Sequence, residues 1–217
     1  MLTQIFNYPS IKDFLVDFLI SILAFLISLT FHEYAHAAVA NALGDPTAKN
    51  LGRMTLDPVK HIDPIGMISL IIFGWGWARP VLIDSRKLKN PRRDDLLIAA
   101  AGPFTNLVLS FIFYVADMLL VYKAGLTDPT LQAVLISISA TNMGQAIFNI
   151  LPIFPLDGYH VFTSIFPKLS FKISPFMIRY GTYILMALSF SGALDYVILP
   201  VSGFFYDLFS KFVMLFL

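Results

Sequence analysis

Long apolar stretches separated by short polar connections dominate the chain. A helix needs about 20 apolar residues to cross the hydrocarbon core of a bilayer. Five stretches approach that length, at about residues 14–43, 96–122, 131–154, 175–190 and 195–217. The pattern therefore predicts an all-α polytopic membrane protein with about five transmembrane helices.

A sixth apolar stretch, residues 65–77, is too short for a normal span and contains Gly66, Gly74 and Gly76. We expect a re-entrant or tilted segment here, shielded from lipid by protein. The flanking residues 51–56 and 80–84 have strand-like patterns, which predict small membrane-proximal β-strands. The length leaves no room for a separate soluble domain, so residues 1–217 are expected to form one integral membrane domain.

Composition supports the membrane assignment and excludes other classes. Hydrophobic residues make up 57% of the chain and charged residues 13%, against roughly 25% charged residues in soluble domains. The net charge of +1 provides no basic field for nucleic acid. The chain has no cysteine, which excludes disulfides and thiolate zinc sites.

Lysine and arginine predict the orientation. Nine of these residues lie between the first two long stretches: Lys49, Arg53, Lys60, Arg79, Arg86, Lys87, Lys89, Arg92 and Arg93. The next connection has only Lys123, and the one after it has Lys168 and Lys172. Basic loops stay in the cytoplasm, so we expect the N-terminus outside and the C-terminus inside, provided that residues 65–77 do not cross. The basic residues 87–93 are expected to contact anionic lipid headgroups.

The sequence FHEYAH lies inside the first apolar stretch. His32 and His36 are four residues apart, which places both on one face of a helix where they can bind one zinc ion. Glu33 is then positioned to act as a general base on a zinc-bound water. The competing interpretation is an inward-facing polar cluster that hydrogen-bonds another helix. Ionisable residues inside an apolar helix are costly, which favours a functional site.

Two histidines do not complete a catalytic zinc site, which usually has three protein ligands. His61, His160 and a carboxylate are the available third ligands. Asp157 follows the third long stretch in the sequence NILPIFPLDG, at the same expected membrane depth as the histidine pair. Asn149 lies at that depth too, and its amide can donate to the oxyanion of a tetrahedral intermediate or make an interhelical hydrogen bond.

The motifs FHEYAH, AGPFTN and NILPIFPLDG, in this order, resemble those of the site-2 protease family of intramembrane zinc metalloproteases. The resemblance spans roughly residues 18–161, with the catalytic core at about 14–161 and C-terminal helices at about 175–217. It implies that His32, His36 and Asp157 bind one zinc ion, that Glu33 is the base, and that Asn149 positions substrate or stabilises the oxyanion. It also matches Gly102 and Asn106 to a GxxxN pattern, for which we expect a packing role.

The resemblance implies a metalloendopeptidase that cleaves membrane-protein substrates in or near their transmembrane segments, in a prokaryotic cell membrane. His61 is expected to have a structural or gating role, and His160 a supporting or surface role. Many relatives carry PDZ or CBS domains or an extra leading helix, and we expect a minimal core without them. The alternatives are a transporter or channel that uses the intramembrane histidines, and an inactive scaffold that binds membrane helices.

Overall fold

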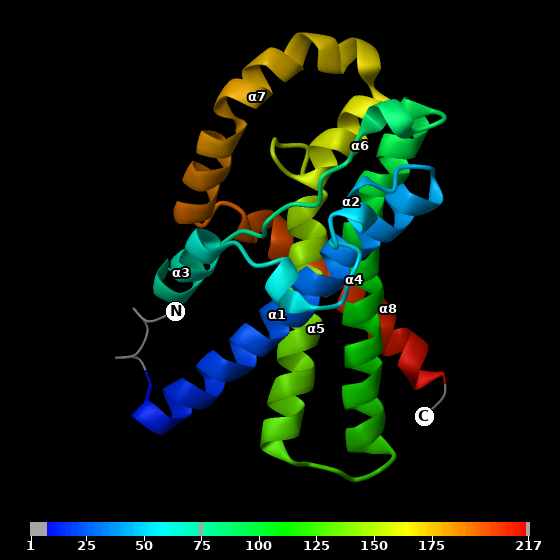
Figure 1. Ribbon diagram of the computed structural model, residues 1–217. Coiled ribbons are helices and arrows are strands. Elements are labelled where there is room, and N and C mark those ends of the chain that lie inside the picture. Colours follow the sequence, from blue (N-terminus) through cyan, green and yellow to red (C-terminus); the bar gives the residue numbers. More distant parts are fainter. Residues whose placement is uncertain (1–7, 74–75, 216–217) are drawn as a thin grey trace.

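A computed structural model describes residues 8–73 and 76–215 (Figure 1). The described chain is helical, with two short 3-10 turns, η2 (Pro58–Lys60) and η3 (Ser85–Lys87). Its helices are α1 (Ile11–Ala42), α2 (Thr47–Asn50), α3 (Pro64–Phe73), α4 (Pro91–Tyr122), α5 (Pro129–Asn149), α6 (Asp157–Ile165), α7 (Pro167–Phe190) and α8 (Asp195–Met214). The prediction of a helical fold is confirmed for the described residues.

Local sequence signals set the helix starts. Ser10 caps α1 by accepting a hydrogen bond from the Asp13 amide at 3.1 Å. Asp128 caps α5 by accepting one from the Leu131 amide at 2.7 Å. In both cases the side-chain oxygen satisfies an amide that has no partner within the helix.

Helices α1, α4 and α5 pack against one another and form the centre of the molecule. α1 crosses α4 and α5 obliquely (Figure 1). The start of α1, the α4–α5 connection and the end of α8 lie toward one end of the molecule, whereas α6 and the start of α7 lie toward the other. α8 packs on the outside of α4 and α5.

Among the described residues, four helices are long and apolar enough to cross a membrane, namely α1, α4, α5 and α8. α7 is not one of them, although the sequence pattern predicts a span at residues 175–190. Lys168, Lys172 and Arg179 lie within α7 and interrupt its apolar character. The structure thus supports a membrane protein with fewer clear spans than the five expected.

The region between α1 and α4 also differs from expectation. Residues 65–73 belong to the short helix α3, whereas Gly74 lies outside the described residues. Residues 51–56 form turns and bends, and residues 80–84 run extended without a strand partner. In the described part of the chain, β-pairing is limited to one antiparallel bridge between Ile62 and Ala78. The amides of Val81 and Asp84 bond to the side chains of Glu33 and Asp45 instead, and Pro80 has no N–H for a ladder.

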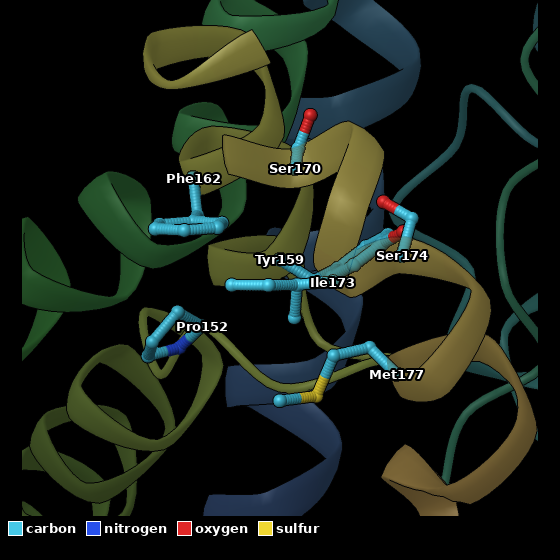
Figure 2. Close-up of a pocket in the computed structure, with 7 residues that line it drawn as sticks. All are labelled: Pro152, Tyr159, Phe162, Ser170, Ile173, Ser174 and Met177. Carbon is cyan, nitrogen blue, oxygen red and sulfur yellow. The ribbon is translucent and has the colours of Figure 1, made fainter. Parts of the chain in front are cut away.

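A cavity of about 140 Å³ separates α7 from the start of α6 (Figure 2). Tyr159 and Phe162 of α6 line it together with Ile173 and Met177 of α7. Beyond the cavity, α7 closes onto the segment after α5, because a Cβ atom on Gly181 would lie 2.5 Å from the Phe154 carbonyl oxygen. α7 therefore leaves a cavity beside α6 and comes into close contact with the Phe154 backbone at Gly181.

Candidate metal centre

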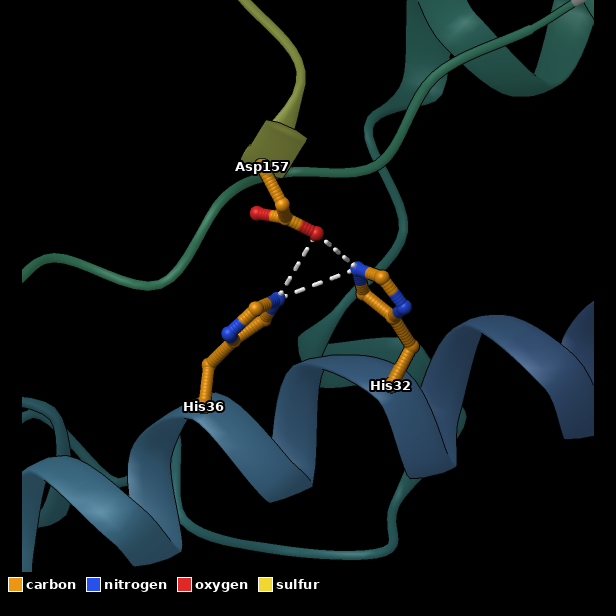
Figure 3. A group of neighbouring side chains, drawn as sticks. All are labelled: His32, His36 and Asp157. Atoms are coloured by element: carbon orange, nitrogen blue, oxygen red, sulfur yellow. Dashed lines mark hydrogen bonds and ion pairs between the residues drawn. The ribbon is translucent and has the colours of Figure 1, made fainter. Parts of the chain in front are cut away.

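Three side chains from two helices converge inside the bundle: His32 and His36 of α1 and Asp157 of α6 (Figure 3). The two Nε2 atoms lie 3.0 Å apart, as expected for residues one helical turn apart. Asp157 Oδ2 lies 3.1 Å from Nε2 of His32 and 3.3 Å from Nε2 of His36. Both histidines are buried, whereas Asp157 is partly exposed.

A polar network fixes the ring of His32. Its Nδ1 lies 3.0 Å from Asn106 Oδ1. The Asn106 amide donates to Ser28 Oγ at 2.6 Å and to Gln145 Oε1 at 3.1 Å, so its oxygen must face the histidine. Ser28 in turn donates to Gln145 Oε1 at 3.0 Å. Nδ1 of His32 is therefore the protonated nitrogen, which leaves a lone pair on Nε2.

His36 has the same tautomer for a different reason. Its Nδ1 lies 2.7 Å from the carbonyl oxygen of Ile98 in α4, an atom that can only accept a hydrogen bond. The proton is therefore on Nδ1, and Nε2 presents a lone pair toward Nε2 of His32. This pairing of ring N–H with an oxygen acceptor is typical of metal-binding histidines.

The donor set fits a divalent cation. When both imidazoles are neutral with the proton on Nδ1, two nitrogen lone pairs and a carboxylate oxygen face one another. Asp157 Oδ2 is buried without a hydrogen-bond partner among the described residues. Two imidazoles and one carboxylate match a catalytic zinc site, in which a fourth position stays open.

Gly102 makes room for both rings. A Cβ atom at this position of α4 would lie 2.5 Å from Cε1 of His32 and closer still to Nε2 of His36. α4 can approach the histidine face of α1 only because residue 102 has no side chain. Gly102, for which we expect a packing role, thus lies directly against the two imidazole rings.

Asp157 reaches the histidines because α5 ends early. The helix stops at Asn149, residues 150–156 form an irregular connection, and Asp157 is the first residue of α6. Gly158 allows this reversal, since a Cβ atom there would overlap the Ile150 carbonyl. Asp157 therefore follows the third span, as the sequence predicts, and is the first residue of a separate helix.

Glu33 lies next to the convergent group and is 7% exposed. Its Oε2 accepts a hydrogen bond of 3.0 Å from the backbone amide of Val81. Val81 belongs to the extended connection between α3 and α4, so this connection reaches the site from outside the helical bundle. The contact fixes the direction of the carboxylate.

The other residues predicted for the site have different surroundings. Asn149 donates to the Gln145 carbonyl oxygen at 3.1 Å. His61 is fully buried, and its Nε2 lies 2.8 Å from the Thr55 carbonyl oxygen. His160 lies 3.4 Å from Asp95, and hydrogen bonding to this carboxylate raises the pKa of His160. The convergent group of three contains none of them.

Sequence reasoning missed several residues that support the site. Ser28 and Gln145 flank Asn106, and Ile98 contributes only its carbonyl oxygen. Spacing offers one signal for the first two: Ser28 lies four residues before His32, and Gln145 four before Asn149. Ile98 and Val81 contribute only backbone atoms, so their residue types do not predict these contacts.

Comparisons with known proteins agree with this geometry. The model of peptidase family M50 matches residues 20–122. The chain is 39% identical to the candidate zinc metalloprotease YwhC of Bacillus subtilis over 155 residues, which cover 67% of this chain and 68% of YwhC. The chain belongs to peptidase family M50. The resemblance to a family of zinc metalloproteases is thereby confirmed.

Two further relatives come from Mycobacterium tuberculosis and Methanocaldococcus jannaschii. The candidate zinc metalloprotease Rip2 of Mycobacterium tuberculosis is 32% identical over 151 residues, which cover 65% of this chain and 55% of Rip2. The candidate zinc metalloprotease MJ0611 of Methanocaldococcus jannaschii is 31% identical over 157 residues, covering 72% and 75% of the two chains. No solved structure matches the chain. The M50 match contains both histidines and Glu33 but ends before Asp157, so geometry carries the assignment of the third donor.

Proposed function

We propose that this M50 protein is an intramembrane zinc metalloendopeptidase that hydrolyses peptide bonds in or near transmembrane segments of membrane-protein substrates. The observation that carries the proposal is the convergence of His32, His36 and Asp157 inside a bundle of membrane-spanning helices, with Glu33 beside them. The names of YwhC, Rip2 and MJ0611 support zinc as the metal.

In this proposal, His32, His36 and Asp157 would hold one zinc ion through the two Nε2 atoms and Asp157 Oδ2. A zinc ion held there would supply Lewis acidity to the scissile carbonyl and to a water molecule, whose pKa zinc lowers to about 7. Asn106 and the Ile98 carbonyl keep both imidazoles in the binding tautomer. Gly102 allows α4 to press these acceptors against the rings.

Glu33 is the general base of the proposal. It follows His32 directly on α1, so its carboxylate borders the metal centre. It accepts a proton from the attacking water and passes it to the amine that leaves when the peptide bond breaks. The Val81 amide bonds one carboxylate oxygen, Oε2, and prevents the side chain from rotating away.

Asn149 is proposed to stabilise the oxyanion or to position substrate. Its side-chain amide has two N–H donors. One of them bonds the Gln145 carbonyl oxygen, which holds the side chain at the end of α5. The second is the donor that we assign to substrate. An oxyanion-hole donor of this kind contributes about 10²–10³-fold to kcat.

For orientation, we propose that the metal centre lies toward the cytoplasmic face of a prokaryotic cell membrane, with the start of α1 outside. The basic residues between α1 and α4 support this side. Four crossings return a chain to the side where it began. The end of α8 lies toward the same end of the molecule as the start of α1 (Figure 1). We therefore propose that both chain ends lie on the same side of the membrane, whereas the charge pattern predicts opposite sides.

The decisive experiment compares wild type with Glu33→Gln in detergent or liposomes, using a single-span membrane protein as substrate. Metal analysis should find about one zinc per chain in both proteins. Cleavage should occur only in the wild type, and should disappear on chelation and return with zinc. Cleavage by Glu33→Gln at the wild-type rate would show that Glu33 is not the general base. Cleavage by metal-free wild type would show that the reaction does not need zinc.

A further inference from the structure

The connection between α3 and α4 contains an extended segment, residues 78–84, which we call the strap. It leads from the α3 region across the bundle toward the start of α4 (Figure 1). At one end, the Arg79 amide donates to the His61 carbonyl oxygen at 2.9 Å, beside the Ile62–Ala78 bridge. At the other end, the Asp84 amide donates to Asp45 Oδ2 at 2.6 Å. The strap is therefore fixed at both ends.

Arg53 holds the strap between these ends. Its Nη2 group donates to the carbonyl oxygens of Arg79 and Pro80, the latter at 3.4 Å. Residue 81 follows directly, and its amide donates to Glu33 at 3.0 Å. The guanidinium thus restrains two successive peptide units, and the second of them, which joins Pro80 to Val81, contains the amide bonded to the catalytic carboxylate.

The burial of Arg53 is unusual for a charged side chain. The residue is 8% exposed, and its Nε–H has no hydrogen-bond partner among the described residues. Burial and the nearby charge of Arg79 lower the pKa of Arg53, and the charge of Glu33 opposes this shift. Taking a guanidinium out of water costs free energy that two carbonyl contacts offset only in part. Stability alone therefore does not account for an arginine at this position.

We propose that Arg53 is a positioning residue for Glu33, acting through the carbonyls of Arg79 and Pro80 on the Val81 amide. Without this restraint the strap moves, the Val81 amide leaves Glu33, and the carboxylate samples directions from which it cannot take the water proton. Substrate binding and metal binding do not use this contact. Loss of Arg53 should therefore lower kcat and leave KM and zinc content close to those of the wild type.

The chemistry of the contact favours arginine over lysine. A planar guanidinium can bridge two successive carbonyls in a fixed geometry, whereas an ammonium group is a point donor on a flexible stem. Arg53→Lys keeps the charge and one contact, so it should recover part of the activity that Arg53→Gln loses. A purely electrostatic effect on Glu33 would instead be recovered in full by lysine.

The test combines Arg53→Gln with Val81→Pro, which removes the amide donor itself. Val81→Ala keeps the amide and should lose less activity than Val81→Pro. The exposed Arg93→Gln on α4 is the control for the loss of an arginine elsewhere. We expect kcat to fall about 10–100-fold in Arg53→Gln and in Val81→Pro, as for other residues that orient catalytic groups. The double variant should be no slower than Val81→Pro alone, because both changes remove one interaction.

Hydrogen exchange of residues 79–84, measured by mass spectrometry on the zinc-loaded protein, gives a readout that needs no substrate. Exchange at the Val81 amide should be faster in Arg53→Gln and unchanged in Arg93→Gln. Any of three results would overturn the proposal. The losses in kcat could multiply in the double variant, exchange at the Val81 amide could be unchanged in Arg53→Gln, or Arg53→Lys could recover the full activity. The inference rests on the proposed peptidase function: a wild type without cleavage would reject that function, whereas the exchange result judges the restraint on the strap by itself.

Discussion

Gly102 of α4 and His36 of α1 are so close that no side chain fits between them. A Cβ atom on residue 102 would overlap Nε2 of His36 and lie 2.5 Å from Cε1 of His32. The glycine and the histidine pair lie in different motifs, yet the metal centre requires both, because α4 also supplies the acceptors Asn106 and Ile98. At this position, the close packing of α4 on α1 is therefore a condition for the arrangement of the metal-binding side chains.

The first prediction concerns this coupling. Gly102→Ala should displace the imidazoles, lower zinc affinity by about 10–100-fold and reduce cleavage at least as much, a loss typical of disturbed ligand support. Gly144 of α5 is the matched control, since a Cβ atom there meets no atom within 4 Å. Gly144→Ala should keep wild-type zinc content, measured by metal analysis after dialysis against a chelator. Equal zinc retention by both variants would show that zinc binding by His32 and His36 does not depend on the missing side chain at residue 102.

The second prediction concerns the tautomer of His32. Asn106→Ala removes the oxygen that holds the proton on Nδ1, so zinc affinity should fall by about 10–100-fold. Asn142 provides the control, because it is an equally buried asparagine whose amide donates to the Ile138 carbonyl oxygen. Asn142→Ala should leave zinc affinity unchanged in a competition titration, whatever its effect on thermal stability. A similar loss in both variants would mean that bundle packing, and not the tautomer, controls the metal.

The third prediction separates the possible third ligands. Asp157→Ala should lose most of its bound zinc, because the carboxylate is the only donor that meets both Nε2 atoms in the described convergent group. His160→Ala and His61→Ala should keep zinc, since these rings bond to Asp95 and to the Thr55 carbonyl oxygen. Metal content of the three purified variants decides the matter. Full zinc in Asp157→Ala with loss in His160→Ala would transfer the ligand role to His160.

The fourth prediction concerns stability in acid. Burial raises the pKa of Asp45, but hydrogen bonds from Thr47 and from the Asp84 amide outweigh this effect and hold the pKa below its ordinary value. The ionised carboxylate therefore stabilises the fold above the unfolded-state pKa of about 3.9. This stabilisation is lost as the pH falls through the lower folded-state pKa.

Asp45→Asn tests this prediction. The variant should unfold at lower temperature at pH 7, by roughly 2–4 °C for each kcal/mol lost. Below about pH 4 the difference from wild type should shrink. Thermal unfolding in detergent across this pH range provides the measurement. A constant difference at every pH would indicate that the carboxylate charge makes no contribution.

Periodicity and spacing in the sequence predict part of the site. The interval between His32 and His36 is one helical turn, which places both rings on one face whatever the tertiary structure. Asp157 follows from topology, because the end of one span and the end of another can share a membrane depth. Long apolar stretches likewise predicted α1, α4, α5 and α8.

Other features depend on tertiary contacts that residue types do not reveal. Residues 80–84 have a strand-like pattern, but their amides bond to Glu33 and Asp45, so no ladder forms. α7 alternates apolar residues with Lys168, Lys172 and Arg179, which makes its membrane character ambiguous in sequence. The role of Val81 lies wholly in its backbone amide, so its side chain gives no sign of it.

The length of α1 has a consequence for how the protein meets its bilayer. A helix of 32 residues is about 48 Å long, whereas the hydrocarbon core is about 30 Å thick. α1 runs obliquely to α4 and α5 (Figure 1), and tilt is the usual response of a long helix to a thin bilayer. Because His32 and His36 are carried by α1 and their acceptors by α4, the angle between these helices sets the geometry of the metal centre. A bilayer whose thickness changed the tilt of α1 against α4 would therefore also change the geometry of the metal centre.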